Sequence, residues 1–544
     1  MKKRILSLIL TVAMMLSVMA ILPISVSAEE EVATFDGTTN LIIYNNADIA
    51  TFDEMVTAGT DFSGKTVTLG NDLTLLSTFD GIGAAGKRFA GTFDGQGYTI
   101  TCAGHTVGDD LGSFFVGLNG ATIKDVTFEG NVNMSSDFSA TVACSVIGTC
   151  LIQNVRVSVY MQSQGNLNYC GGFVSCTSSN NDAELTFNSC VFDGTMNFGN
   201  QASNIGGFFA LTSLTESKTR NVNFKNCVYA GKISLNDTQI SRYVGCFAGY
   251  IQKNSNVVVE DCYSIGEITF REGTNDSKSN GGVIIGQKDG SNKILTVKNF
   301  YYVSLYNQSG TEMDILQTGR DTDNIVSTEN VVAKTTEQIA ALTAENSGFS
   351  ANATFSFKEN TYWDTYYPCP TGLVKDGAWV DSLMVSVDAQ VEGAQIRITD
   401  PADAYSGIRF VAKFRESITV DPGTADANFG LILVSKTKYE TWSALEGEAK
   451  TFAALVEAGV QVPAVKATTE NDVVTVKATV YNIQAANYRD EIVAIPYVDG
   501  EIVGEAVARS IFGVASKCVD DAKATAAQKT FAQESIDNAP AVEE

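Results

Sequence analysis

Few residues of this chain have the types and spacing that catalysis requires. His105 is the only histidine in 544 residues, so a Ser-His-Asp triad, a Cys-His pair or a histidine-rich zinc site would have to use it. It lies in CAGHTVGDD, where a loop histidine is the simpler interpretation. Gly81–Gly86 matches GxGxxG, but KRFAGTF follows it instead of a helix that could receive a phosphate. Asp321–Asn324 is too short for a calcium-binding loop. We therefore expect no metal site and no cofactor.

Paired carboxylates are the other possible catalytic arrangement, because enzymes that cleave polysaccharides use two acidic groups on one face. In the repeat described below, Asp125 and Asp261 share a column but lie about 19 Å apart, beyond the ~5–9.5 Å that glycoside hydrolysis uses. Glu129 and Asp193 lie ~10 Å apart, which is borderline for an inverting enzyme. Carboxylates on a solvated surface would give the same pattern, so Glu129 and Asp193 carry only the weaker, catalytic hypothesis.

An internal repeat must position any functional side chain. Six segments show the alternation of apolar residues that is typical of strands, and a second apolar strand, entered through glycine, precedes most of them. No helical period fits between these strands, which favours a β-solenoid made of stacked coils over a βαβ array. We predict that one column of equivalent residues points into the solenoid: Val126, Val155, Cys190, Cys227, Cys262 and Phe300.

Exposed aromatic rings are the main binding signal. Alternation turns the residues after the inward column outward, and these include Tyr263 and Tyr301. Trp363, Tyr366 and Tyr367 form a second candidate group. Rings on a solenoid face can stack on sugars or dock a protein. Packing against a cap or the next domain is the alternative for both groups.

The chain has eleven cysteines, and an odd number leaves at least one unpaired within the chain. Three of them stand in the inward column, which valine and phenylalanine share, so we expect packing residues there. Disulfides between neighbouring coils, such as Cys190 with Cys227, are the alternative.

Two resemblances add to this interpretation. The stretches VGCFAGYI and VVVEDCYSIGEI resemble the GLUG repeats of Gram-positive surface proteins, although CSVIGTCLIQNV lacks their Gly-Gly entry. This resemblance covers roughly residues 41–373 and implies a right-handed parallel β-helix, without implying a chemistry. Further on, GIRFVAKF and the Asn-Ile and Asn-Tyr stretches near residue 485 resemble a β-sandwich module of secreted clostridial proteins.

The N-terminus has the pattern of a secretory signal peptide. A basic start at residues 2–4 precedes an apolar stretch and a small-residue cleavage site at Ala28. The formal net charge of −25 becomes more negative after cleavage and predicts repulsion of nucleic acid and anionic lipid. We expect a signal peptide over 1–28, a β-helix with an N-terminal capping helix and a C-terminal cap over 29–375, a linker over 376–384, and a β-sandwich with one or two helices over 385–540.

Together these features predict an all-β, secreted or cell-surface protein that does not insert into a membrane once the signal is removed. Adhesion or ligand binding is the favoured function, with a glycan or a surface protein as the partner. A polysaccharide lyase or glycoside hydrolase is the first alternative, and a structural spacer is the second. The lack of an acidic cluster favours binding over catalysis.

Overall fold

The computed structural model separates into two compact units. The β-helix unit runs to Phe357 and includes Tyr367–Leu383, and the sandwich unit contains Lys358–Tyr366 and the chain from Met384 onwards. The structure describes residues 34–541 except 108–111, 136, 164, 179–180, 200–201, 213–217, 236–242, 253, 271–280, 289–293, 307–309, 316–324, 399–405, 425, 446–448, 465–466 and 471. The predicted signal peptide lies outside the described residues.

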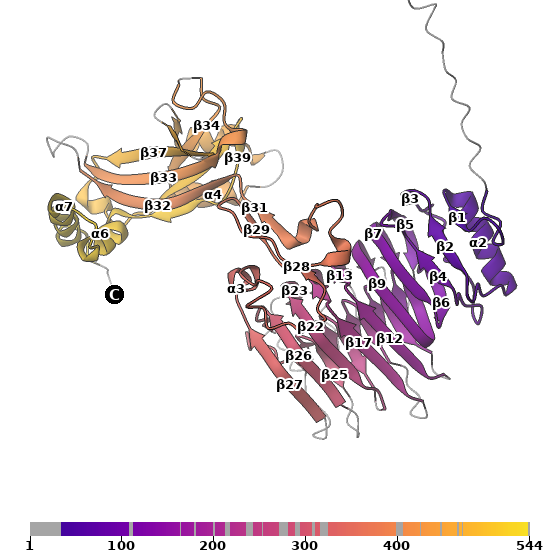
Figure 1. Cartoon of the computed structure of the whole chain (residues 1–544). Coiled ribbons are helices and arrows are strands. Elements are labelled where there is room, and N and C mark those ends of the chain that lie inside the picture. Colours follow the sequence, from indigo (N-terminus) through magenta and orange to yellow (C-terminus); the bar gives the residue numbers. More distant parts are fainter. Residues whose placement is uncertain are drawn as a thin grey trace, which may run out of the picture. The chain divides into compact units, whose positions relative to one another are not determined.

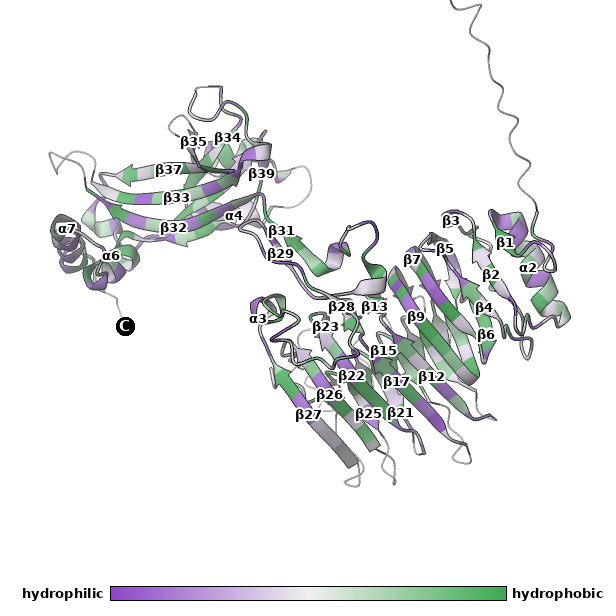
Figure 2. Cartoon of the chain, viewed as in Figure 1, coloured by the Kyte–Doolittle hydropathy of each residue, from purple (hydrophilic) through white to green (hydrophobic). Residues whose placement is uncertain are grey.

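The β-helix unit is a stack of coils in which each strand pairs in parallel with its equivalent in the next coil (Figure 1). Figure 2 shows hydrophobic and hydrophilic bands alternating along these strands. The all-β class and the parallel β-helix are thus confirmed. The first strands are β1 (Ile42–Ile43), β2 (Thr66–Leu69), β3 (Leu73–Thr74), β4 (Thr92–Asp94), β5 (Thr99–Val107), β6 (Phe115–Asn119), β7 (Thr122–Met134), β8 (Ser139–Ala140) and β9 (Ala143–Ser163).

The strands of the later coils repeat in a fixed order. One wall is formed by β12 (Ala183–Asn188), β17 (Arg220–Lys225), β22 (Val257–Ser264), β26 (Ile294–Tyr302) and β27 (Ile325–Ala333), with β13 (Val191–Phe192) and β18 (Val228–Tyr229) after the corner. The next wall contains β14 (Thr195–Phe198), β19 (Lys232–Leu235) and β23 (Glu267–Phe270). The coil then closes through β10 (Cys170–Gly171), β15 (Ile205–Gly206), β20 (Val244–Gly245) and β24 (Gly281–Gly282), followed by β11 (Val174–Thr177), β16 (Phe209–Leu211), β21 (Ala248–Ile251) and β25 (Ile285–Lys288).

The predicted inward column is confirmed. Its six members are at most 1% exposed, and strand pairing places Val126 opposite Val155 and Cys262 opposite Phe300. Beside this column, each coil turns a corner through a residue with positive φ, a conformation that Asn and Asp tolerate best after glycine. The corner residues are Asp125, Asn154, Ser189, Asn226, Asp261, Asn299 and Asn330. This geometry explains why polar residues precede the column in every repeat.

Aromatic stacking and a helix complete the core. The rings of Phe173, Phe208 and Phe247 stack from coil to coil with centroids 4.8 and 5.1 Å apart. Helix α2 (Asn46–Ala58) buries Ile49, Phe52 and Val56 against the same core cluster. We expected a helix of this kind to cover the first coil, because a solenoid needs its end closed.

A strap, defined as residues 335–357 and 367–383, crosses the outside of the coils. It contains α3 (Thr336–Ala340), β28 (Phe355–Ser356), β30 (Cys369–Pro370) and two short 3₁₀ turns, Thr371–Leu373 and Asp381–Leu383. Its contacts run back along the corner residues: Ser350 N donates to Asp261 Oδ1 at 2.8 Å, and Thr354 N to Asn226 Oδ1 at 3.2 Å. Most of the predicted linker, 376–384, is therefore part of a packed segment of the β-helix unit.

The sandwich unit packs two antiparallel sheets around one core. One sheet has β32 (Ala389–Arg397), β33 (Gly407–Arg415), β37 (Val473–Tyr481) and β36 (Thr468–Glu470); the other has β35 (Val460–Pro463), β34 (Phe429–Ser435), β38 (Ile492–Val498), β39 (Glu501–Ile502) and β40 (Val507–Arg509). The predicted sandwich is confirmed, with four α-helices in its described part where one or two were expected. Helices α4 (Lys436–Ser443) and α5 (Phe452–Ala458) cover the second sheet, and α6 (Ile511–Asp520) and α7 (Ala526–Asp537) join the core. A short pair, β29 (Asp364–Tyr366) and β31 (Met384–Ser386), completes the unit.

The structure describes all eleven cysteines and joins none of them in a disulfide; ten are buried and Cys518 is half-buried. Burial raises the pKa of Cys102, Cys246 and Cys369 to about 12, so these thiols stay protonated and unreactive. We expect a thiol-specific chromogenic reagent to titrate about one thiol in the native protein and eleven in denaturant. Reductant should leave the melting temperature unchanged, whereas a melting temperature that falls by several degrees would reveal a disulfide.

Candidate functional site

The two tyrosines proposed as exposed binding residues are buried. Tyr263 is 0% exposed and Tyr301 is 3% exposed. Their hydroxyls donate to the strap carbonyls of Pro368 and Ser347. Alternation correctly turns both rings away from the inward column, but the strap packs over them. The expectation that these rings are free to stack on a ligand is therefore wrong.

The second aromatic group is also packed. Trp363, Tyr366 and Tyr367 are 9%, 7% and 8% exposed. Within the sandwich unit, the Arg415 guanidinium lies 5.7 Å from the Trp363 ring centroid. Tyr367 joins the apolar cluster under the strap. These rings serve packing, which was the alternative interpretation.

The two carboxylates of the catalytic hypothesis differ in environment. Glu129 is exposed and accepts a hydrogen bond from Thr101 Oγ1 at 3.2 Å. The Asp193 side chain is 1% exposed, and its Oδ2 accepts from Arg156 Nε at 2.8 Å and from Ser382 Oγ at 2.6 Å. The expectation of a solvated Asp193 is wrong, because the strap covers it. With Asp193 buried and bonded to Arg156 and Ser382, the two carboxylates do not face one open site, as an inverting enzyme requires.

An exposed polar surface covers one wall of the β-helix unit. We call it the polar face. It is built from the ends of β7 and β9 and from β14, β19 and β23, whose alternate side chains point inward and are buried. The outward side chains form two rows in strand register, Asn131, Tyr160, Thr195, Lys232 and Glu267 in the first, and Asn133, Gln162, Asn197, Ser234 and Thr269 in the second.

Hydrogen bonds fix several side chains of the polar face. Asn197 Nδ2 lies 3.1 Å from the Tyr160 hydroxyl, across one coil spacing and one row. Thr269 Oγ1 donates to Ser234 Oγ at 3.2 Å, and Lys232 pairs with Glu267 at 3.0 Å. Neighbouring coils are about 4.8 Å apart, so amide and hydroxyl groups repeat along the axis at that interval.

Tyr160 is the only aromatic residue in these two rows and is 42% exposed. Its ring is held by the strand and by Asn197, and hydroxyl and amide groups that both donate and accept surround it. This arrangement suits a ligand with an apolar ring face and a periphery of hydroxyls. Sequence reasoning missed the polar face because it followed the tyrosines next to the cysteine column. The signal was present in GNVNM, SVYMQS and GTMNF, where polar residues alternate with buried ones.

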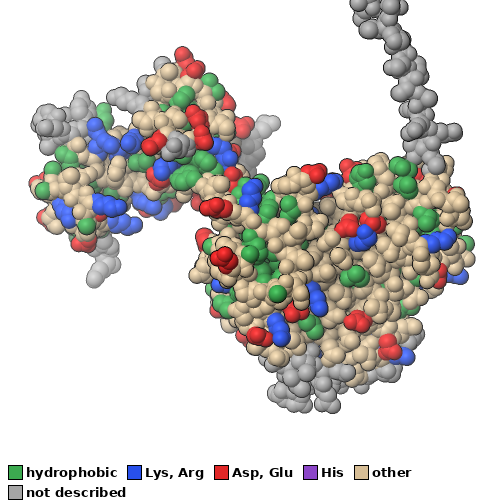
Figure 3. Space-filling model, in the orientation of Figure 1, with side chains coloured by type: hydrophobic (Ala, Val, Ile, Leu, Met, Phe, Trp, Pro, Cys, Tyr) green, Lys and Arg blue, Asp and Glu red, His purple; other side chains and the backbone are tan. Residues whose placement is uncertain are grey.

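The remaining chemistry-bearing residues of the described chain do not form a second centre. His105 is buried, with Nε2 2.8 Å from the Gly112 carbonyl, and burial lowers its pKa. No cluster of three metal-binding side chains occurs among the described residues. No described helix has the length and apolar character needed to cross a bilayer. Acidic and basic side chains are interspersed on the side of the β-helix unit that Figure 3 shows.

Comparisons with known proteins place few constraints on this chain. No family model matches it, and no curated protein matches it. A solved structure named "putative immunoglobulin A1 protease", from Bacteroides ovatus, is similar over 55% of this chain and 85% of that chain. The two are 17% identical, with a TM-score of 0.40.

Proposed function

We propose that this protein is a secreted or cell-surface binding protein whose polar face holds a glycan. The observation that carries the proposal is the exposed Tyr160 ring set within rows of amide and hydroxyl side chains. Sugar rings present apolar C–H faces that stack on aromatic rings, and their hydroxyls both donate and accept hydrogen bonds. Side chains held on strands lose little conformational entropy when a ligand binds, which favours affinity.

The environments of Glu129 and Asp193 favour binding over cleavage. Asp193 is occupied by Arg156 and the strap, so it is not available to act together with Glu129. Secretion is supported by the signal-peptide pattern, and the interspersed surface charge agrees with a neutral or weakly charged partner.

The test is a glycan array with the mature protein, followed by calorimetric titration of the best ligand. Tyr160→Ala should weaken binding about five- to thirty-fold, or ~1–2 kcal/mol, because the stacking surface is lost. Tyr306→Ala is the matched control, since Tyr306 is an exposed tyrosine of the same unit outside the polar face. Its affinity should equal that of the parent protein.

Three outcomes would contradict the proposal. An array without a ligand would leave a spacer or a protein adhesin. Equal losses from Tyr160→Ala and Tyr306→Ala would remove the polar face as the site. Release of new reducing ends from a polysaccharide, abolished by Glu129→Gln, would establish the enzyme alternative.

A further inference from the structure

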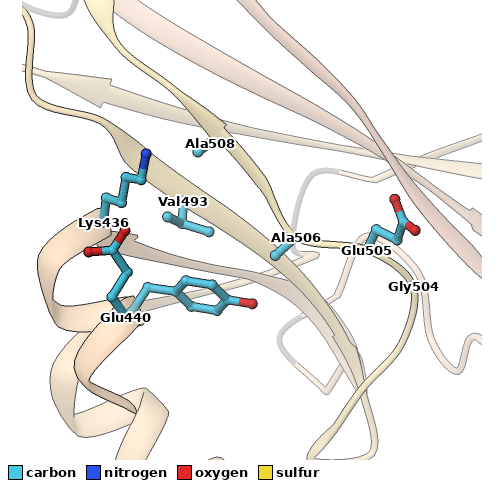
Figure 4. Close-up of a pocket in the computed structure, with 8 residues that line it drawn as sticks. Lys436, Glu440, Val493, Gly504, Glu505, Ala506 and Ala508 are labelled. Carbon is cyan, nitrogen blue, oxygen red and sulfur yellow. The ribbon is translucent and has the colours of Figure 1, made fainter. Parts of the chain in front are cut away.

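A groove of about 500 Å³ lies on the sandwich unit, between helix α4 and the edge formed by β38, β40 and the turn before β40. This volume is within the usual range of small-molecule sites. Figure 4 shows Lys436 and Glu440 together at one end and Glu505 at the other, with Val493, Ala506 and Ala508 between them.

The tyrosine of this groove, Tyr439, is positioned by the core beneath it. Tyr439 is half-buried, and its ring lies against that of Trp442, with centroids 5.9 Å apart and planes tilted by 33°. Trp442 in turn is buried in the cluster between α4 and the second sheet, and its Nε1 donates to the Thr451 carbonyl at 3.0 Å. Ala506 and Ala508 carry short side chains, so the space beside the ring stays open.

Three polar side chains that line the groove are available to a ligand. No described residue hydrogen-bonds to the Tyr439 hydroxyl or to the carboxylates of Glu440 and Glu505. Lys436 is ion-paired with Glu491 at the rim, and its ammonium still has donors to offer. The groove therefore presents a donor and acceptors around an aromatic ring.

We infer that this groove is a second ligand site, which binds one or two residues of a neutral sugar. A ring with acceptors at both ends and a donor at one matches the apolar face and hydroxyls of a sugar. The two carboxylates disfavour phosphates and acidic sugars. The site lies in the other unit from the polar face and does not depend on it.

The test uses the full-length mature chain and saturation-transfer NMR with maltose, cellobiose and lactose at millimolar concentration. At least one disaccharide should give a signal that Tyr439→Ala reduces at least five-fold. Tyr481→Ala, which removes an exposed tyrosine from β37, should keep that signal. Ala508→Leu, which fills the groove and leaves Tyr439 in place, should also abolish it, provided that its melting curve matches that of the parent protein.

Several results would overturn the inference. They are no signal from any of the three sugars, a signal that survives both Tyr439→Ala and Ala508→Leu, and binding of a polylysine peptide that Tyr439→Ala abolishes. A signal that is lost only with Tyr160→Ala would also overturn it, while supporting the polar face as the binding surface.

Discussion

Replacing Arg156 with methionine is expected to lower the free energy of unfolding of the β-helix unit by about 3–5 kcal/mol. The Asp193 carboxylate is 1% exposed, and two guanidinium nitrogens lie 2.8 and 2.6 Å from its Oδ2. Without the guanidinium, that charge stays buried with Ser382 as its remaining hydrogen-bond donor among the described residues. Urea unfolding followed by tryptophan fluorescence would measure the loss, because Trp379 lies in the strap, where its Nε1 donates to the Tyr367 carbonyl.

The matched control is the double variant Arg156→Met with Asp193→Leu. It removes the unpaired buried carboxylate, so it should recover most of the lost stability. A loss below about 1 kcal/mol, or a double variant no better than the single one, would show that this pair behaves as a surface salt bridge.

The second large effect is expected at Tyr263, where alanine should cost about 3–5 kcal/mol. The ring is fully buried between β22 and the strap, and its hydroxyl donates to the Pro368 carbonyl. Burial raises the pKa of Tyr263, so the hydroxyl stays protonated and keeps donating at ordinary pH. Urea unfolding, combined with limited proteolysis of residues 335–383, would show both the stability loss and a loosened strap.

Tyr263→Phe separates the ring from the hydroxyl. It should cost only about 1 kcal/mol, because it removes one hydrogen bond and keeps the apolar contacts. If alanine and phenylalanine destabilised equally, the hydrogen bond to Pro368 would dominate instead of the packing. If alanine left the strap resistant to protease, the strap would be held by its other contacts.

The repeat made the β-helix predictable, because each coil repeats the same local pattern at intervals of 29 to 38 residues. Cys227 and Cys262 could be placed inward from alternation alone. The corner residues could be recognised as turns, although their positive φ required the structure. Periodicity carries this information because every residue meets its equivalent in the neighbouring coil.

The strap could not be predicted in the same way. Pro368 lies 105 residues beyond Tyr263, and Ser350 lies 89 residues beyond Asp261, with no repeat that links them. One signal was available. Val191, Val228, Tyr263 and Tyr301 form a largely apolar run of the outward column, and such a run rarely stays exposed on a protein surface. The alternation therefore predicted which way these side chains point. Their burial depends on the strap, a segment with no periodicity.

The path of the strap also sets an order of events during synthesis. Residues 335–383 follow every coil in the chain, so each coil is made before the segment that covers its outward apolar column. A protein that emerges N-terminus first can stack its coils as they appear. Its outward apolar column nevertheless stays uncovered until residues 335–383 arrive and dock against the corner residues Asp261 and Asn226. The nascent β-helix thus passes through a stage in which its outer wall exposes an apolar surface that could bind other chains. Docking of the strap ends that stage.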